Sequence, residues 1–124
     1  MRSTSLALVT LCMALTGPQA MAAGPAKACF HSRSVTNFAA VNDQTVNLRV
    51  GVREVYRLEL LGSCPDIDWQ EALGLQSRGS SWICDGLDVT LFSKGPFGPQ
   101  RCPVRSIHKL TPQEIEALPS RDRP

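Results

Sequence analysis

Four cysteines spread over the chain beyond residue 28 place the strongest constraint on the fold: Cys29, Cys64, Cys84 and Cys102. Structural zinc sites usually place ligand pairs about two to four residues apart, and no two of these cysteines are that close. A C-x-x-C redox motif is also missing from their spacing. A chain of this size has a thin core, to which cross-links add much stability. In an exported protein, the even count would favour two disulfides.

The N-terminus has the pattern of a secretory signal peptide. Arg2 precedes an apolar run at 6–15, which Gly17-Pro18 ends, and Ala20-Met21-Ala22 offers small residues to a signal peptidase. The run is shorter than the about 20 residues that a membrane-spanning helix needs. We therefore expect residues 1–22 to be removed, with cleavage after Ala23 as the alternative, and the protein to be periplasmic or secreted.

The mature chain is close to neutral. Loss of residues 1–22 removes Arg2 and lowers the formal net charge from +2 to +1. Lysines and arginines form no run or stripe, so we expect no nucleic-acid partner. A lipid anchor would need a cysteine in a small-residue context, which neither Cys12 nor Cys29 has. We expect one domain at 29–119, after a disordered lead-in at 23–28 and before a flexible tail at 120–124.

Two neighbouring segments alternate between apolar and polar residues, as half-buried strands do. In Thr45–Val50 the apolar residues share one face, and Asn47 and Arg49 are expected on the outer face. In Val55–Leu61 the inward residues are Tyr56, Leu58 and Leu60. A short connection containing Gly51 separates the segments, which predicts an antiparallel hairpin.

The rest of the chain predicts shorter elements. We expect strands at 33–38, 82–84, 88–92 and 102–107, the last at an edge because Pro103 has no N–H. The Gly- and Pro-rich segment 93–99 predicts a loop outside the sheet. Capping patterns predict two short helices, one beginning at Asp68 and one at Thr111. The expected fold is mostly β (α+β): a small antiparallel curled sheet or open barrel with two short helices.

The disulfide pairing has three possible forms. We favour Cys64 with Cys84, which would close the predicted helical excursion between two strands. Cys29 would then pair with Cys102 and tie the start of the domain to its last strand. The sequence leaves the other two pairings open.

Nothing in the sequence has the pattern of a catalytic or metal site, so we expect no enzyme activity and no cofactor. His31 and His108 are the only histidines and lie far apart along the chain. The pairs Asp66/Asp68 and Asp85/Asp88 could hold a calcium ion, but a helix cap and a turn explain them more simply.

The outer face of the predicted hairpin carries a candidate anion contact. Arg49 and Arg57 lie on that face, and Arg53 lies at its turn. Such a group could bind an acidic glycan, a lipid headgroup or an acidic protein. The alternative is an ordinary solvated face, because glutamates alternate with these arginines.

Most of the few aromatic side chains are expected in the core, namely Trp69, Trp82 and Phe92. Phe97 is expected to be exposed, because it lies in the predicted loop at 93–99.

Six short segments resemble a bacterial family of small exported proteins classed as a domain of unknown function: Ala28-Cys29-Phe30, 42–46, 56–60, 62–65, 83–86 and 101–104 with Ile107. The resemblance covers nearly the whole mature chain, and its most specific part is the spacing of the four cysteines around the hairpin. It implies export and a β-rich domain with two disulfides, and it implies no activity.

Taken together, these features predict a non-enzymatic periplasmic binding or interaction module whose partner is a protein or a cell-envelope component. A small periplasmic enzyme or an enzyme inhibitor is the alternative. An inhibitor would present a rigid loop, for which 93–101 is the candidate segment.

Overall fold

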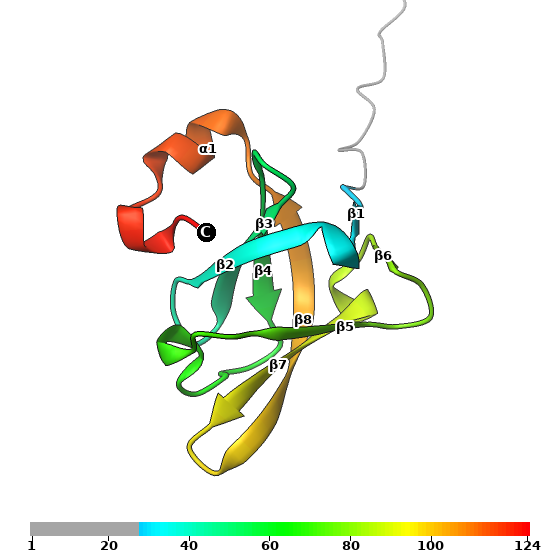
Figure 1. Cartoon of the computed structure of the whole chain (residues 1–124), viewed down its shortest axis with the longest axis vertical. Coiled ribbons are helices and arrows are strands. Elements are labelled where there is room, and N and C mark those ends of the chain that lie inside the picture. The colour runs from blue at the N-terminus through cyan, green and yellow to red at the C-terminus, as the bar shows by residue number, and fades with distance from the viewer. Residues whose placement is uncertain (1–27) are drawn as a thin grey trace, which may run out of the picture.

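The structure is a computed structural model that describes residues 28–124. The predicted signal peptide, residues 1–22, and nearly all of the lead-in at 23–28 lie outside the described residues. Figure 1 shows the arrangement of the elements, whose bounds are β1 (Phe30–His31), η1 (Ser32–Ser34), β2 (Val35–Ala40), β3 (Thr45–Val50), β4 (Glu54–Leu60), η2 (Ile67–Trp69), β5 (Gly74–Ser77), β6 (Trp82–Ile83), η3 (Gly86–Asp88), β7 (Val89–Gly95), β8 (Gly98–Lys109), α1 (Pro112–Ala117) and η4 (Ser120–Asp122).

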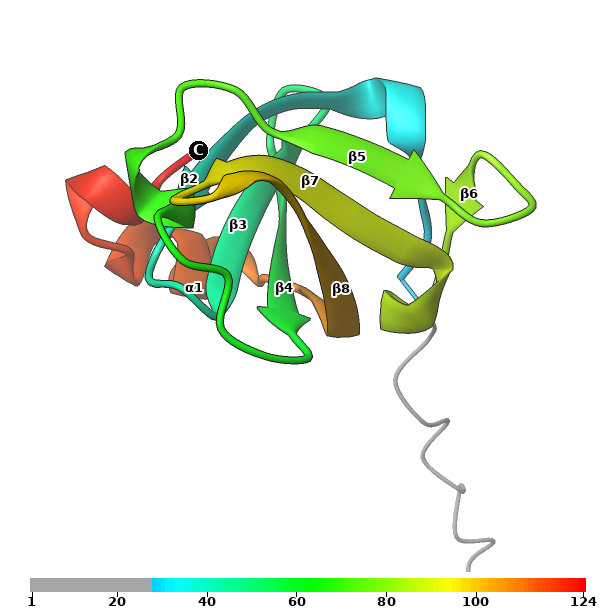
Figure 2. The same ribbon diagram turned by 90° about the horizontal axis from the view of Figure 1, so that it is seen from below.

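The six longer strands form one antiparallel sheet in the order β2-β3-β4-β8-β7-β5, and the short β1 pairs with β6. The sheet curls so that its two edge strands, β2 and β5, lie opposite the central strands (Figures 1 and 2). The result is an antiparallel half-barrel, which confirms the predicted mostly β fold with a curled sheet.

The predicted hairpin is confirmed as β3 and β4, which pair from Thr45↔Glu59 to Val50↔Glu54. Val46, Leu48 and Leu58 are essentially inaccessible on the inner face of the curl. Phe30 closes one end of this core, with its ring centroid 4.7 Å from that of Tyr56. The alternation of the sequence therefore placed the apolar residues of this hairpin correctly.

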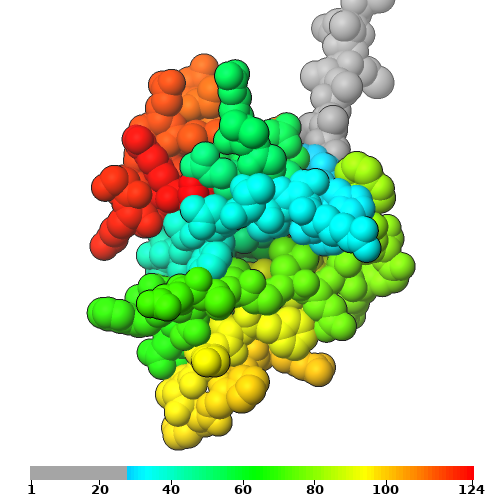
Figure 3. All heavy atoms as spheres, in the orientation of Figure 1, coloured from blue at the N-terminus to red at the C-terminus, as the bar shows by residue number. Residues whose placement is uncertain are grey.

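β8 corrects two predictions at once. It runs from Gly98 to Lys109 and lies in the middle of the sheet, between β4 and β7. The predicted edge strand at 102–107 is thus a central one. The predicted loop at 93–99 is the end of a β7–β8 hairpin in which Gly95 pairs with Gly98. This hairpin protrudes at the lower end of the molecule in Figure 3.

One of the two predicted helices forms. Thr111 caps α1, and a capping box with Glu114 is present. The prediction of a helix beginning at Asp68 is wrong, because the chain makes only the single 3-10 turn η2 and then enters β5. Ile67 is fully buried and draws this segment onto the core, and β5 pairs along β7 from Gly74. No helix in residues 28–124 is long and apolar enough to cross a membrane.

The favoured disulfide pairing is wrong, because the bonds join Cys29 to Cys84 and Cys64 to Cys102. Cys29 and Cys84 adjoin the paired strands β1 and β6, in which Phe30 lies opposite Ile83. Cys64 follows the end of β4, where Leu60 pairs with Val104 of β8. This pairing brings Cys64 beside Cys102. The segment between Cys64 and Cys84 carries β5 along β7 instead of returning as a helix, so these two cysteines do not meet.

The residues predicted as a flexible tail, 120–124, instead form η4 and pack against the outer face of β3 and β4. Asn47 Nδ2 donates to the carbonyl oxygen of Asp122 at 2.8 Å. Leu118 and Leu110 form a small second core with Val55 on this face. Asn47, predicted on an exposed face, is fully buried as a result.

Candidate anion-binding site

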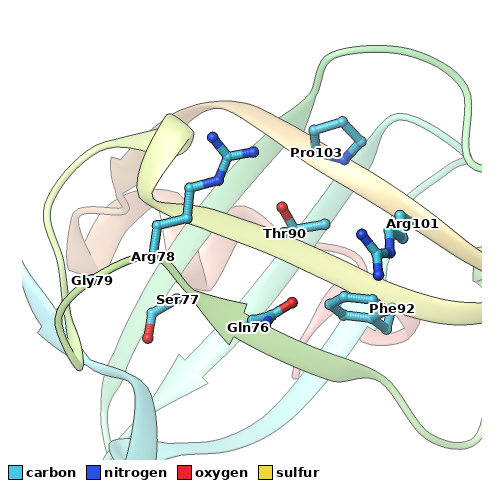
Figure 4. Close-up of a pocket in the computed structure, with 8 residues that line it drawn as sticks. All are labelled: Gln76, Ser77, Arg78, Gly79, Thr90, Phe92, Arg101 and Pro103. Atoms are coloured by element: carbon cyan, nitrogen blue, oxygen red, sulfur yellow. The ribbon is translucent and has the colours of Figure 1, made fainter.

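A hollow of about 470 Å³ lies on the outer face of strands β5, β7 and β8 (Figure 4). Strand register places its residues in rows, with Gln76 opposite Thr90 and Phe92 opposite Arg101. Alternate residues of a strand point to the same face, so Thr90 and Phe92 face outwards while Val89 and Leu91 are buried in the core. The lining residues are Gln76, Ser77, Arg78, Gly79, Thr90, Phe92, Arg101 and Pro103.

Two arginines dominate this hollow. The guanidinium carbon of Arg101 lies 5.4 Å from the centroid of the Phe92 ring. Arg78 follows β5, and its backbone N–H donates to the carbonyl oxygen of Asp88 at 2.7 Å, which ties the start of the loop to the sheet. Figure 4 shows their side chains on either side of Thr90, one from the loop after β5 and one from β8.

Both guanidinium groups are free to bind a ligand. None of the side-chain hydrogen bonds and ion pairs within residues 28–124 involves Arg78 or Arg101. The lining contains no aspartate or glutamate, so no carboxylate neutralises the two charges. Guanidinium groups bind carboxylates and phosphates through paired N–H donors. Ser77, Thr90 and Gln76 add neutral hydrogen-bonding groups, so the hollow is chemically suited to an oxyanion.

The same lining residues offer no set for catalysis. A serine or threonine hydroxyl acts as a nucleophile when a base such as a histidine, carboxylate or lysine activates it, and the eight residues around the hollow include no such base. The arrangement can therefore hold and orient an anion, and it supplies no base of those types to activate a hydroxyl.

The predicted anion contact divides into two parts in the structure. Arg49 and Arg57 share the outer face of β3 and β4 and have intramolecular partners. Arg49 Nε donates to the carbonyl oxygen of Pro124 at 2.7 Å, and Arg57 Nε donates to Asn47 Oδ1 at 3.1 Å. Arg53 is exposed at the turn between the two strands. Arg49 and Arg57 are therefore engaged within the molecule, whereas Arg53 makes no side-chain hydrogen bond within residues 28–124.

The histidines and carboxylates considered above are also separate. His31 Nδ1 accepts from the backbone of Arg33 at 3.2 Å, while His108 Nε2 lies 3.5 Å from Glu114. Asp85 and Asp88 cap η3 in a capping box. No group of three or more potential metal ligands occurs within the part of the chain that the structure describes.

The ionisable groups with shifted pKa values lie on β4, at the far end of β8 and on α1. Burial raises the pKa of Tyr56, with Glu54 adding to the effect. The hydrogen bond from Lys109 to Glu54, with Nζ and Oε1 2.5 Å apart, raises the pKa of that lysine. The backbone N–H of Thr111 lowers the pKa of Glu114.

Two residues of the site, Arg78 and Arg101, were not among the sequence candidates. The sequence predicts a loop at 93–99, which gives Arg101 no cross-strand neighbour. The pattern around it contains the missing signal, because Arg101 immediately precedes the buried Cys102 and must face outwards on a strand. Phe92, expected in the core, is half-buried beneath it. Trp69 and Trp82 are exposed instead of buried, whereas Phe97 is exposed as predicted.

Comparison with known proteins identifies a family of unknown function. No curated protein matches this chain. No solved structure matches it either. The family model described as "Family of unknown function (DUF6491)" matches residues 1–123. Because that match covers almost the whole sequence, the chain belongs to the DUF6491 family of unknown function.

Proposed function

We propose that this protein is an exported, non-enzymatic binding module that holds a phosphate or carboxylate group of a cell-envelope component in the hollow of β5, β7 and β8. The observation that carries the proposal is that the guanidinium groups of Arg78 and Arg101 have no hydrogen-bond or ion-pair partner within residues 28–124 and share a lining without acidic residues. Two arginines that line one hollow without a counter-charge favour an anionic ligand over solvent alone.

Two features support export. The N-terminal sequence has the charge, apolar run and small residues of a signal peptide. The two disulfides are of the kind that persists in oxidising compartments. The lining of the hollow has no histidine, carboxylate or thiol, which supports binding as opposed to catalysis.

The test compares two double variants of equal charge. R78S/R101S removes the proposed contacts, and R33S/R53S removes two exposed arginines elsewhere on the surface. Both mature proteins are eluted with salt from phosphocellulose and from carboxymethyl cellulose, which separates phosphate from carboxylate recognition. Titration calorimetry with inorganic pyrophosphate and with citrate gives the affinities.

We expect R78S/R101S to elute at lower salt than R33S/R53S and to bind the preferred anion at least tenfold more weakly than the wild type. Equal elution of the two variants would mean that net charge alone governs retention and would reject the site. Loss of retention and affinity in R33S/R53S alone would place the anion contact at the turn that contains Arg53.

An enzyme inhibitor is a second candidate, favoured by one observation. The tip of the β7–β8 hairpin presents Phe97 with its side chain fully exposed, between Gly95 and Gly98, which pair with each other. A rigid hairpin with an apolar side chain at its tip could enter the cleft of another protein. Protein partners captured by mild cross-linking of the exported fraction should then be lost in F97S and kept in R78S/R101S.

A further inference from the structure

A second part of the surface has a different chemistry, centred on Trp69. This side chain is 82 % exposed at the end of η2, whereas Ile67, two residues earlier, is fully buried. In Figure 3 the green segment that contains η2 projects from the side of the molecule, above the yellow β7–β8 hairpin. An exposed indole offers a large flat apolar face to a ligand.

The backbone that carries Trp69 is held firmly to the sheet. The side-chain amide of Gln70 donates to the carbonyl oxygen of Lys94 at 2.8 Å and accepts from the N–H of Lys94 at 3.4 Å. It also donates to the carbonyl oxygen of Asp66 at 3.0 Å. With Ile67 buried on one side and these bonds on the other, binding at the indole would order little additional chain, which favours affinity.

Two shallow hollows meet at the indole. One, of about 320 Å³, is lined by Trp69, Gln70, Glu71, Ala72 and Lys94. The other, of about 280 Å³, is lined by Trp69, Ala40, Val41, Asp68 and Arg121. Each hollow has one acidic and one basic side chain, so the surface around Trp69 carries no net charge.

This combination restricts the ligand. Charge balance disfavours a simple anion or cation, and the charged groups around a single aromatic disfavour a lipid surface. The apolar C–H face of a sugar ring matches the indole face, and its hydroxyl groups match carboxylate, ammonium and guanidinium partners. The two hollows that share the indole leave room for further rings beside the stacked one.

We propose that Trp69 is the stacking platform of a binding site for a neutral oligosaccharide, separate from the anion site. Asp68 in one hollow and Glu71 in the other accept hydrogen bonds from sugar hydroxyls, and Lys94 and Arg121 donate to them. Since the site extends over two hollows, a trisaccharide binds at least tenfold more tightly than the corresponding monosaccharide.

The chain has two tryptophans, which makes a direct test possible. W82F leaves Trp69 as the only indole fluorophore, and W69F leaves Trp82, which is 56 % exposed, as the matched control. Each mature protein is titrated with cellotriose and with triacetylchitotriose, and emission is followed. Calorimetry with W69A and W82A then measures affinity without a fluorophore, and R78S/R101S is included to separate the two sites.

We expect a saturable shift in emission for W82F and none for W69F, at least a tenfold loss of affinity in W69A, and less than a twofold change in W82A and R78S/R101S. No response of W82F to either sugar at millimolar concentration would overturn the proposal, as would equal responses in both single-tryptophan proteins. Loss of a cross-linked protein partner in W69A, without sugar binding by the wild type, would assign the surface to a protein.

Discussion

Gly86 lies against the backbone of another element. A Cβ atom at this position would be 2.5 Å from the carbonyl oxygen of Arg105 in β8. That distance is far too short for a carbon atom, and the neighbouring atoms are backbone, which cannot rotate away. The absence of a side chain is what allows η3 to pack directly on the sheet beside the Cys29–Cys84 bond.

We therefore predict that G86A lowers the free energy of unfolding by about 1–3 kcal/mol, the usual cost of forcing extra atoms into a packed site. Gly62 is the matched control, because a Cβ there would have no neighbour within 4 Å, and G62A should change stability by less than about 0.5 kcal/mol. Urea unfolding measures both. Similar midpoints for the two variants would show that η3 can move away from β8.

Burial of single residues was only partly predictable from the sequence. The alternation in 45–50 correctly separated the two faces of β3, and Asn47 does lie on the outer one. The segment that covers this face comes from 75 residues further along the chain, where Asp122 accepts its hydrogen bond. A local pattern contains no information about such a distant cover. The prediction that Trp69 and Trp82 lie in the core is wrong for the opposite reason, because apolar character alone does not bring a side chain into the core.

At the scale of elements, the hairpin of β3 and β4 was predictable because alternation and a Gly-containing turn agree. The β7–β8 hairpin was not, because glycines and prolines obscure its pattern. Pro103 is tolerated in the central strand β8 for a specific reason. Its carbonyl oxygen accepts from Leu61 at 2.9 Å, at the end of the β4 ladder where the register shifts. The missing N–H of Pro103 therefore falls beside an irregularity, where prolines are accepted.

The capping box of α1 supports a pH prediction. Glu114 Oε2 accepts from the backbone N–H of Thr111 at 2.7 Å, which lowers the pKa of the carboxyl group. A lowered pKa means that the folded state favours the charged form, so this stabilisation is present above the ordinary carboxyl range and is lost as pH falls through the lowered pKa. E114Q should therefore be less stable than the wild type at pH 7, and the difference should shrink at pH 3.

E116Q is the control for this prediction, since it removes the same charge from an exposed position of the same helix. Thermal unfolding at both pH values measures the effect. A deficit of E114Q that is equal at pH 7 and pH 3 would show that the charge of the capping carboxylate does not contribute.

At the scale of the whole molecule, the two disulfides have similar loop lengths and different surroundings. Their sequence separations are 55 for Cys29–Cys84 and 38 for Cys64–Cys102, and loop-closure entropy alone would assign about 4 kcal/mol to each. Cys64 and Cys102 are buried in the core, whereas Cys29 is exposed. Removal of the Cys64–Cys102 bond therefore also removes packing contacts in the core.

We predict that C64A/C102A loses more stability than C29A/C84A, by about 1–3 kcal/mol beyond the shared entropic effect. Urea unfolding of both variants under non-reducing conditions measures the difference, and peptide mapping of the unreduced wild type verifies the pairing. Equal losses would mean that chain entropy accounts for the whole contribution of both bonds.

The sequence predicted the overall architecture better than its connections. Cysteine number, hairpin alternation and turn residues were enough for a curled β domain with two disulfides. Pairing depends on which strands become neighbours, and the central position of β8 follows from contacts with β4 and β7 across the whole chain. The candidate site depends on that same position, because Arg101 and Phe92 meet only when β8 lies beside β7.

The central place of β8 also determines when the domain can be completed during synthesis. Strands β2 to β4 are made first and leave the edge of β4 unpaired until residues 98–109 emerge. The β5–β7 pair has the same open edge until that point. Neither half can close alone, so a nascent or truncated chain that ends before residue 98 exposes two unpaired strand edges and is prone to aggregate. Folding of this domain is therefore a late event that follows the release of nearly its whole sequence.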